Sequence, residues 1–358
     1  MAENLRVLVA GIGDMGGSHA KGYAELDGYE IAGLVVRKNV ERAKKFAQKL
    51  GISVPIFTDF YEGMKETKPD VASINTYADT HKDYTIHALR QGCHIFVEKP
   101  LTRTLEEAEE VRKVVQETGK KVVVGYILRQ HPAWVKFIEL AQTLGKPLIM
   151  RMNLNQQSFG REWALHKTFI GNMPPLVDCG VHYVDVMCQM TRAKPKMVQG
   201  IAARVSDEID ADKHNYGMLQ VVFEDNSVGW YEVGWGPMMS QMAFFVKDVV
   251  GPKGSVSIEK DLSGVDSSDV SKHAMVNSLR FHPADTDAEG NRVREDEWIF
   301  TEDEPDHDGL CKREQAYLYK CITENIDLSE HLEDAINSMK ICFAAVESYN
   351  TGKAVHLD

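Results

Sequence analysis

The sequence predicts an α/β domain built on a doubly wound parallel sheet, followed by an α+β domain with a large, mostly antiparallel open sheet. Three observations carry this prediction. Up to residue 126, short apolar segments alternate with helical periods of about ten residues. A glycine-rich turn directly follows the first apolar segment. After residue 126, apolar segments follow one another without helices between them, which is typical of antiparallel sheets. We expect the domains to be residues 1–125 and 126–358.

The first domain is expected to consist of strands joined by helical crossovers. The predicted strands are 5–10, 30–36, 54–57, 71–76, 93–97 and 121–126, and the predicted helices are 15–26, 40–50, 59–67, 81–91 and 105–118. Strands separated by helices in this way lie parallel in one sheet. Ligands of such sheets bind at the carboxyl ends of the strands, so functional side chains are expected there.

A glycine motif of the form G-x-G-x-x-G opens the first crossover. It comprises Gly11, Ile12, Gly13, Asp14, Met15 and Gly16. Between a strand and a helix, the first glycine permits the tight turn, the second lets the backbone approach a pyrophosphate and the third packs the helix on the strand. The helix N-terminus then offers N–H donors to the phosphates. The motif predicts a dinucleotide-binding domain, and we assign all six residues to the cofactor.

The second predicted strand ends in Arg37 and Lys38, where an NAD-binding domain would carry an acid for the ribose 2′-hydroxyl. A guanidinium at this point can pair with a 2′-phosphate, which a carboxylate would repel. The alternative is an exposed basic turn before the next helix. We expect a preference for NADP(H), with NAD(H) as the alternative cofactor.

The predicted strand 93–97 ends in Glu98, Lys99 and Pro100. Because proline has no N–H for the ladder, the strand stops there and the two charged side chains emerge at its carboxyl end. The loop that follows strand 71–76 lies at the same edge. The cofactor contacts expected at this edge are Thr76, His81, Glu98 and Lys99. A surface lysine before a turn proline is the alternative for Lys99.

Residues 177–190 form an almost wholly apolar helix with one polar stripe. Its members, spaced four, three and four apart, are Asp178, His182, Asp185 and Gln189. A helix that is apolar around most of its girth is largely buried, so the stripe must face a ligand, a wet cleft or a partner. His182 suits a general base because imidazole titrates near neutral pH, and Asp178 suits its orientation. A paired histidine in the core is the alternative.

The second domain is expected to hold most of the remaining strands. The predicted strands are 147–156, 196–205, 217–223, 228–235, 242–249 and 254–258, and further helices are expected at 133–143, 309–324 and 333–350. Asn155 and Gln157 alternate on one strand face and could bind substrate hydroxyls. Trp235 either stacks on a sugar ring or lies in the core. The acidic run 285–308 is interpreted as a solvated loop or hairpin without a function.

The glycine motif, the loop ending in His81 and the strand end Glu98-Lys99-Pro100 together resemble the Gfo/Idh/MocA oxidoreductases. The pattern Asp178-x-Gly180-x-His182-x-x-Asp185 resembles the second signature of that family. The resemblance covers nearly the whole chain and implies a Rossmann domain followed by a substrate-binding domain. It also implies a catalytic group of Lys99, Asp178 and His182, in which Lys99 stabilises charge that develops on the substrate oxygen.

Substrate contacts follow from the same resemblance. Arg129 lies where the family often places a substrate-binding base, and His307 resembles a position that inositol-dehydrogenase relatives use. The alternative for each is an exposed side chain without a special role, Arg129 on the surface and His307 in an acidic loop. The full expected set is Lys99, Arg129, Asn155, Gln157, Asp178, His182, Trp235 and His307. Relatives commonly pair through the exposed sheet face, so a homodimer or homotetramer is expected.

Composition argues against several other classes of protein. The net charge of −12 disfavours nucleic acids and anionic membrane surfaces as partners. No apolar run approaches the roughly 20 residues of a membrane span, and the first strand leaves no room for a signal peptide. The six cysteines show no metal or redox spacing, and no His/Cys pair has a ligand spacing within one predicted element. We therefore expect a cytoplasmic protein without a metal.

Together these features predict an oxidoreductase that interconverts a ring hydroxyl and a ketone, or a hemiacetal and a lactone, on a sugar or inositol. Two alternatives stay open. A glycosidase-like enzyme would oxidise its sugar only transiently and show no net cofactor reduction. A non-catalytic NADP-binding regulator would use the Asp178/His182 stripe at a protein interface and would transfer no hydride.

Overall fold

The computed structural model describes residues 4–241, 245–261, 266, 267, 269, 272–301 and 303–357. Its residues form two compact units. The first contains the described residues up to Ile127 together with Pro305–Ile336, and the second contains those of Leu128–Glu304 and Asn337–Asp358. The chain thus returns to the first unit late in the sequence. The domains 1–125 and 126–358 follow chain order instead and stay a prediction.

The first unit is built on a six-stranded sheet in the order β3-β2-β1-β4-β5-β6, in which all neighbouring strands are parallel. The strands are β1 (Leu5–Ala10), β2 (Tyr29–Val35), β3 (Ile56–Phe57), β4 (Val71–Ile74), β5 (His94–Val97) and β6 (Val122–Val124). The strand order reverses between β1 and β4, which is the ligand-binding point of doubly wound sheets. The predicted Rossmann-type sheet is confirmed.

Helices connect these strands and complete the unit. They are α1 (Asp14–Glu25), α2 (Val40–Lys49), α3 (Phe60–Thr67), α4 (His81–Arg90), α5 (Leu105–Thr118), α10 (His307–Thr323) and the first part of α11 (Ser329–Thr351). Side-chain caps begin several of them, because a capping oxygen satisfies an N–H that has no partner inside the helix. Asp59 accepts from the N–H of Glu62 at 2.8 Å, and Thr104 accepts from the N–H of Glu107 at 3.2 Å.

The second unit is built on a nine-stranded sheet in the order β14-β13-β12-β11-β7-β10-β9-β8-β15. The strands are β7 (Ile149–Gln156), β8 (Pro195–Ala203), β9 (Tyr216–Phe223), β10 (Val228–Trp235), β11 (Lys247–Gly251), β12 (Gly254–Glu259), β13 (Ser278–Pro283), β14 (Glu297–Ile299) and β15 (Val355–His356). The central pair β7–β10 is parallel, and the other neighbours are antiparallel. This confirms the predicted mostly antiparallel sheet.

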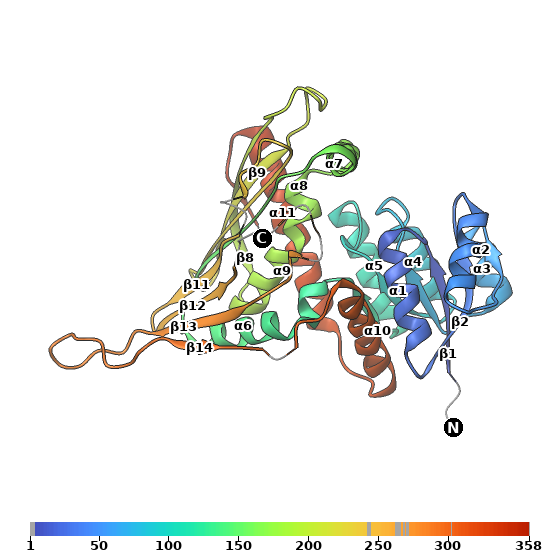
Figure 1. The fold of residues 1–358 in the computed structure, drawn as a ribbon, viewed down its shortest axis with the longest axis horizontal. Helices are drawn as coiled ribbons and strands as arrows, with labels where there is room; N and C mark the ends of the chain where they lie inside the picture. The colour runs from blue at the N-terminus through green and yellow to red at the C-terminus, as the bar shows by residue number, and fades with distance from the viewer. Residues whose placement is uncertain are drawn as a thin grey trace. The chain divides into compact units, whose positions relative to one another are not determined.

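One face of this sheet is covered by helices and the other is open (Figure 1). The helices of the unit are α6 (Pro132–Thr143), α7 (Gly160–Asn172), α8 (Pro175–Asp178), α9 (Gly180–Thr191) and the second part of α11, and a 3-10 turn, η1 (Ile127–Gln130), precedes α6. Along β7 the side chains of Met150 and Met152 are buried, whereas Ile149 and Arg151 are exposed. Neighbouring residues of a strand point to opposite sides of the sheet, so Met150 and Met152 lie on the covered face and Ile149 and Arg151 on the open face.

Several elements differ from the sequence prediction. Helix α7 and strands β13, β14 and β15 were not expected. The strand predicted at 242–249 lies partly outside the described residues, and β11 begins at Lys247. Helix α10 begins at His307, two residues before the predicted start, because Asp306 accepts from the N–H of Gly309 at 2.8 Å.

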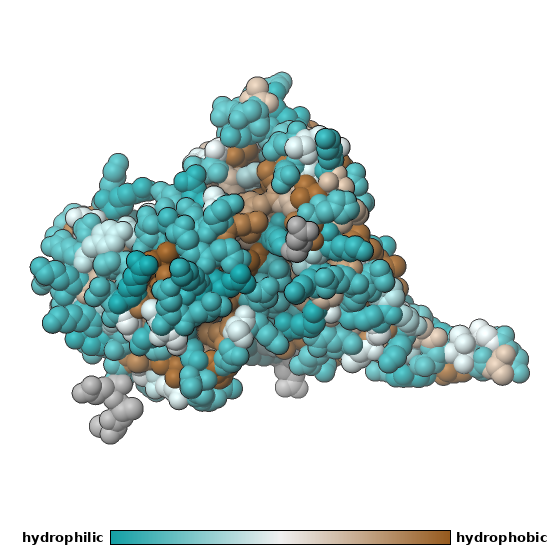
Figure 2. Space-filling model, turned by 180° about the vertical axis from the view of Figure 1, so that it is seen from behind, coloured by the Kyte–Doolittle hydropathy of each residue, from teal (hydrophilic) through white to brown (hydrophobic). Residues whose placement is uncertain are grey.

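Residues 285–296 of the acidic run form a hairpin that extends from the sheet between β13 and β14 (Figure 1), and the run ends at the start of α10. Thr286 and Arg292 form a bridge within it, and Arg294 pairs with Asp285 at 3.2 Å. The surface of this arm is largely hydrophilic (Figure 2). The interpretation as a solvated hairpin is consistent with this geometry.

All six cysteines lie in the described part of the chain and are free thiols, five of them buried. Within the same residues, no helix combines the length and apolar character that crossing a membrane requires.

Candidate functional site

The glycine motif forms the turn between β1 and α1. Gly11 has φ +86°, and a Cβ there would lie 2.5 Å from the carbonyl oxygen of Asn75. A Cβ at Gly16 would lie 1.8 Å from the carbonyl oxygen of Gly11. A Cβ at Gly13 would meet no atom within 4 Å, and this residue supplies no side-chain cap to α1. Gly13 therefore leaves room beside the N-terminal end of α1, where N–H groups can bind a phosphate.

The other residues assigned to the cofactor in this region lie around that turn. Ile12 is buried, and Asp14 is exposed and pairs with Arg42 at 3.5 Å. Arg37 and Lys38 follow β2 and are both exposed. Both cations are thus accessible at the carboxyl end of β2, where the sequence analysis placed the contact with the ribose.

The loop between β4 and α4 is held by His81. Its Nδ1 lies 2.8 Å from the carbonyl oxygen of Pro100, and its Nε2 lies 3.0 Å from that of Thr76. Burial lowers the pKa of His81, while the two carbonyls oppose that shift. The residue is 1% exposed. The imidazole thus ties the loop to the strand end, and Thr76 is the more exposed of the two. The cofactor contacts expected for both residues stay a prediction.

Glu98 is buried at the end of β5, and its expected contact with a cofactor stays a prediction. Its Oε1 lies 2.8 Å from Nε2 of His19, and its Oε2 accepts from the N–H of Lys99 at 3.1 Å. His19 in turn accepts at Nδ1 from the Gln315 amide at 2.8 Å. Lys99 itself is half-buried. His19 and Gln315 were not among the predicted site residues, although His19 lies one turn after Gly16 on the buried side of α1.

Asp178 and His182 occupy two consecutive helices and not the single helix that was predicted. Asp178 ends α8, Cys179 is the junction, and α9 begins at Gly180. A Cβ at Gly180 would lie 3.2 Å from Sγ of Cys342 and 3.3 Å from Cε1 of Tyr231, so the glycine lets α9 pack closely. Asp178 and His182 are both half-buried and remain about one turn apart. Both belong to the second unit, and Lys99 belongs to the first.

The far half of the polar stripe is structural. Asp185 accepts from Nε and Nη2 of Arg129 at 2.9 and 2.6 Å, and from Nε2 of Gln189 at 2.9 Å. The Asp185 side chain is 1% exposed and that of Arg129 is 13% exposed. Burial raises the pKa of Asp185, and the Arg129 guanidinium opposes that shift. Two nitrogens of the expected substrate base are thus committed to a buried carboxylate.

On β7, Gln156 lies on the same face as Met150 and Met152, the face that the helices cover. Its Oε1 accepts from Nε1 of Trp235 at 2.5 Å and lies 4.0 Å from Sγ of Cys179. Asn155 points to the opposite face, where its amide donates to Glu232 at 2.8 Å, and the Gln157 amide donates to the carbonyl oxygen of Met239 at 2.6 Å. Gln156 is thus the polar side chain beside the α8–α9 junction, and the hydroxyl-binding role of Asn155 and Gln157 stays a prediction.

Trp235 lies in the core, which favours the second of its two interpretations. It is 1% exposed, and its ring stacks on His166 with centroids 4.4 Å apart. His166 comes from α7, and its Nδ1 lies 2.9 Å from Oγ of Ser158. Burial lowers the pKa of His166 to about 4, and the Asp178 charge opposes that shift. His166 is thus a further imidazole near Asp178 that was missed because α7 was not predicted.

His307 is the first residue of α10 and belongs to the first unit. Its Nδ1 lies 3.9 Å from Sγ of Cys311, and burial lowers its pKa. This i, i+4 pair corrects the statement that no histidine and cysteine share an element at ligand spacing. Among the described residues, His19, Cys311 and Glu314 have ligand-type atoms within 4.8 Å of one another. Because both ring nitrogens of His19 are hydrogen-bonded within the protein, we assign no metal to this group.

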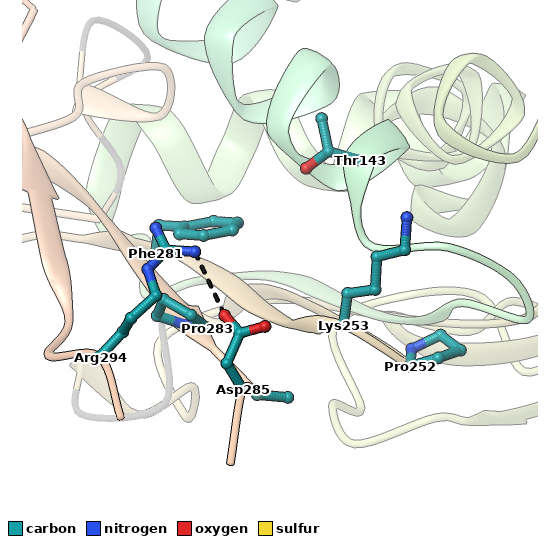
Figure 3. A pocket seen from close by; sticks show the side chains of 8 residues that line it. Thr143, Pro252, Lys253, Phe281, Pro283, Asp285 and Arg294 are labelled. Carbon is teal, nitrogen blue, oxygen red and sulfur yellow. Dashed lines mark hydrogen bonds and ion pairs between the residues drawn. The ribbon is translucent and has the colours of Figure 1, made fainter. Parts of the chain in front are cut away.

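A pocket lies at the base of the hairpin (Figure 3). It is lined by Thr143, Pro252, Lys253, Phe281, Pro283, Ala284, Asp285 and Arg294. Its only carboxylate, Asp285, pairs with Arg294. The pocket holds none of the predicted site residues, and we assign it no function.

Family models recognise both halves of the chain. The model described as "Oxidoreductase family, NAD-binding Rossmann fold" matches residues 5–126, and the model described as "Oxidoreductase family, C-terminal alpha/beta domain" matches residues 141–357. The chain belongs to the Gfo/Idh/MocA oxidoreductase family. The resemblance drawn from the motifs is confirmed.

Two curated relatives indicate what this Gfo/Idh/MocA protein is similar to. It is 31% identical over 205 residues to scyllo-inositol 2-dehydrogenase (NAD(+)) from Bacillus subtilis (strain 168), covering 56% of this chain and 58% of the relative. It is 29% identical over 208 residues to UDP-N-acetylglucosamine 3-dehydrogenase from Acidithiobacillus ferrooxidans, covering 58% of this chain and 61% of the relative. The chain spans about three fifths of the length of each.

The fold of this Gfo/Idh/MocA protein is also found in solved structures. One is the crystal structure of scyllo-inositol dehydrogenase from Lactobacillus casei with bound NAD(H) and scyllo-inositol. The match has a TM-score of 0.76 and 18% identity, and it covers 99% of both chains. This likeness shows the shared two-domain fold.

Proposed function

We propose that this protein is a nicotinamide-dependent dehydrogenase that oxidises a secondary hydroxyl of a cyclic polyol or sugar. The observation that carries the proposal is the combination of an open glycine turn at α1 with Lys99 at the end of β5 and the Asp178/His182 pair at the α8–α9 junction. The dehydrogenase names of the relatives support it.

The chemistry divides between proton and hydride. His182 takes the hydroxyl proton as general base, and Asp178 orients the imidazole and stabilises its protonated form. Lys99 donates a hydrogen bond to the substrate oxygen, which gains negative charge as the proton leaves. The nicotinamide ring of a bound dinucleotide would accept the hydride from the carbon. The products are a ketone, a proton and a reduced cofactor, so atoms and electrons balance.

The residues at the glycine turn fit a dinucleotide, and Arg37 and Lys38 favour NADP(H) over NAD(H). Both cations are exposed where the ribose phosphate would lie, and a guanidinium pairs well with phosphate. The test is Arg37→Asp, which should lower the affinity for NADP and raise the relative affinity for NAD. An unchanged preference would remove this part of the proposal.

The substrate assignment is tested with a panel of inositols and aldoses, each with NAD and with NADP. Turnover should appear as reduced nicotinamide and a ketone or lactone product. Lys99→Ala and His182→Ala should lower kcat by about 10²–10⁴-fold while cofactor affinity stays unchanged. Full activity in either variant would refute the assignment. Glycoside cleavage without net cofactor reduction would establish the glycosidase-like alternative instead.

We also propose that the protein is a homodimer or homotetramer that pairs through the open face of the large sheet. Its exposed apolar side chains on that face include Ile149, Ile201, Val228 and Trp298. Ile149 and Val228 are direct neighbours on adjacent strands, so they form a continuous apolar patch. Ile149→Glu should dissociate the assembly in sedimentation experiments, and a monomeric wild type would refute the idea. The free thiols fit a reducing, cytoplasmic location.

A further inference from the structure

A chain of buried hydrogen bonds runs through the first unit and ends at the backbone N–H of Lys99. The Gln315 amide on α10 donates to Nδ1 of His19 on α1 at 2.8 Å. Nε2 of His19 reaches Oε1 of Glu98 at 2.8 Å, and Oε2 of Glu98 accepts from the backbone N–H of Lys99 at 3.1 Å. The chain joins three segments that are far apart in the sequence, since residues 19 and 315 are 296 positions apart.

The direction of the bonds is fixed by chemistry. A neutral imidazole that accepts at Nδ1 must carry its proton on Nε2, so His19 donates to the Glu98 carboxylate. His19 is 0% exposed and Glu98 is 6% exposed, so little water can replace this donor. A buried carboxylate without a hydrogen-bond donor is destabilised, because its lost hydration is not replaced. The carboxylate is then expected to move toward another donor.

Residues on β5 and directly after β6 pack closely around the His19–Glu98 pair. The ring of Phe96 on β5 packs against the His19 ring with centroids 4.5 Å apart. Gly125 makes room for both Phe96 and the carboxylate, because a Cβ there would lie 3.2 Å from Cζ of Phe96 and 3.3 Å from both Cδ and Oε2 of Glu98. Both oxygens of Glu98 thus have defined partners in a close-fitting site.

We propose that His19 is a positioning residue for Lys99, acting through the Glu98 carboxylate. His19 holds Glu98, and Glu98 holds the backbone of Lys99 at the carboxyl end of β5. The ammonium group of Lys99 then starts from a fixed main-chain position when it donates to the substrate oxygen. This inference rests on the proposed role of Lys99. A displacement of about 1 Å at a catalytic group can cost about 10²-fold in rate, so a residue that touches no substrate can still control kcat.

The experiment compares two substitutions at His19. His19→Leu removes the donor at similar volume, and His19→Gln restores an N–H at similar reach. His19→Leu should lower kcat by about 10–100-fold, with substrate KM and cofactor Kd unchanged. His19→Gln should recover most of the loss. Glu314→Gln is the matched control, because Glu314 is a buried neighbour on α10 outside the chain of bonds, and its kcat should equal that of the wild type.

The outcomes separate this inference from the proposed function. A wild-type kcat in His19→Leu, while Lys99→Ala is inactive, overturns the positioning role alone. An active Lys99→Ala overturns the proposed function. Equal loss in the Leu and Gln variants, with lowered melting temperatures in both, shows that His19 only packs and also overturns the proposal. Should His19→Leu fail to fold, Gly125→Ala decides, since its Cβ presses on the Glu98 carboxylate: reduced kcat with unchanged cofactor Kd supports the proposal, and wild-type kcat overturns it.

Discussion

Replacing Arg129 by methionine should destabilise the second unit by about 3–5 kcal/mol, the usual loss when one partner of a buried ion pair is removed. The Asp185 side chain is 1% exposed and would lose two of the three donors that hold it, at 2.9 and 2.6 Å, and keep only Gln189. At about 2–4 °C per kcal/mol for a domain of this size, the melting temperature should fall by about 6–20 °C.

Urea unfolding followed by tryptophan fluorescence measures this loss. The double variant Arg129→Met/Asp185→Leu removes both charges, so it should lie within about 1–2 kcal/mol of the wild type and far above the single variant. A single variant that costs less than about 1 kcal/mol would mean that the pair behaves like an exposed one, and the reasoning from burial would be wrong.

The same double variant tests the expected substrate contact of Arg129. Because the pair is removed as a unit, activity can be measured without an unpaired buried charge. A raised KM with unchanged stability would assign a substrate role to the guanidinium. An unchanged KM would leave Arg129 as a residue that supports α9.

Two further predictions concern the first unit. Burial and the nearby Glu98 charge raise the pKa of Glu314 well above its usual range, so the folded state retains this proton and the wild type should lose stability as pH rises above the ordinary pKa of a glutamate. Glu314→Gln should flatten that slope in urea unfolding at several pH values, and parallel slopes would contradict it. Gly13→Ala should fold normally, because its Cβ meets no atom within 4 Å, yet bind dinucleotide at least about tenfold more weakly in a fluorescence titration. Gly16→Ala should instead unfold more readily, because its Cβ would lie 1.8 Å from a backbone oxygen, and the reverse ranking would refute these two roles.

Features that depend only on neighbouring residues, such as helix caps and tight turns, could be predicted from the sequence. Thr104 caps α5 and Leu105 begins it as the sequence predicts, and the glycine turn has the positive φ at Gly11 that the motif requires. Helix α7 was not predicted, and only Trp163 and Ile170 of its residues are buried, so most of its surface does not pack against the core.

The sequence could not predict which face of a strand is covered by helices, or which residues far apart in the chain form hydrogen bonds. The alternation of β7 shows that Asn155 and Gln156 face opposite sides, but the sequence does not state which side carries the helices. Asp185 looked like a ligand-facing member of the stripe until its partner Arg129, 56 residues away, was placed. The His19–Glu98 contact likewise depends on the sheet order, which brings α1 beside β5 only in three dimensions.

Helix α10 has a consequence for any attempt to study the dinucleotide-binding half by itself. Leu318 and Cys321 are buried in the same core as Val7 and Tyr29, and the hydroxyl of Tyr29 donates to the carbonyl oxygen of Gln315 at 3.0 Å. A fragment that ends at residue 126 would lack α10, so the side chains that pack against α10 would be exposed to water. The core of the first unit therefore becomes complete only when the segment Pro305–Ile336 has been synthesised.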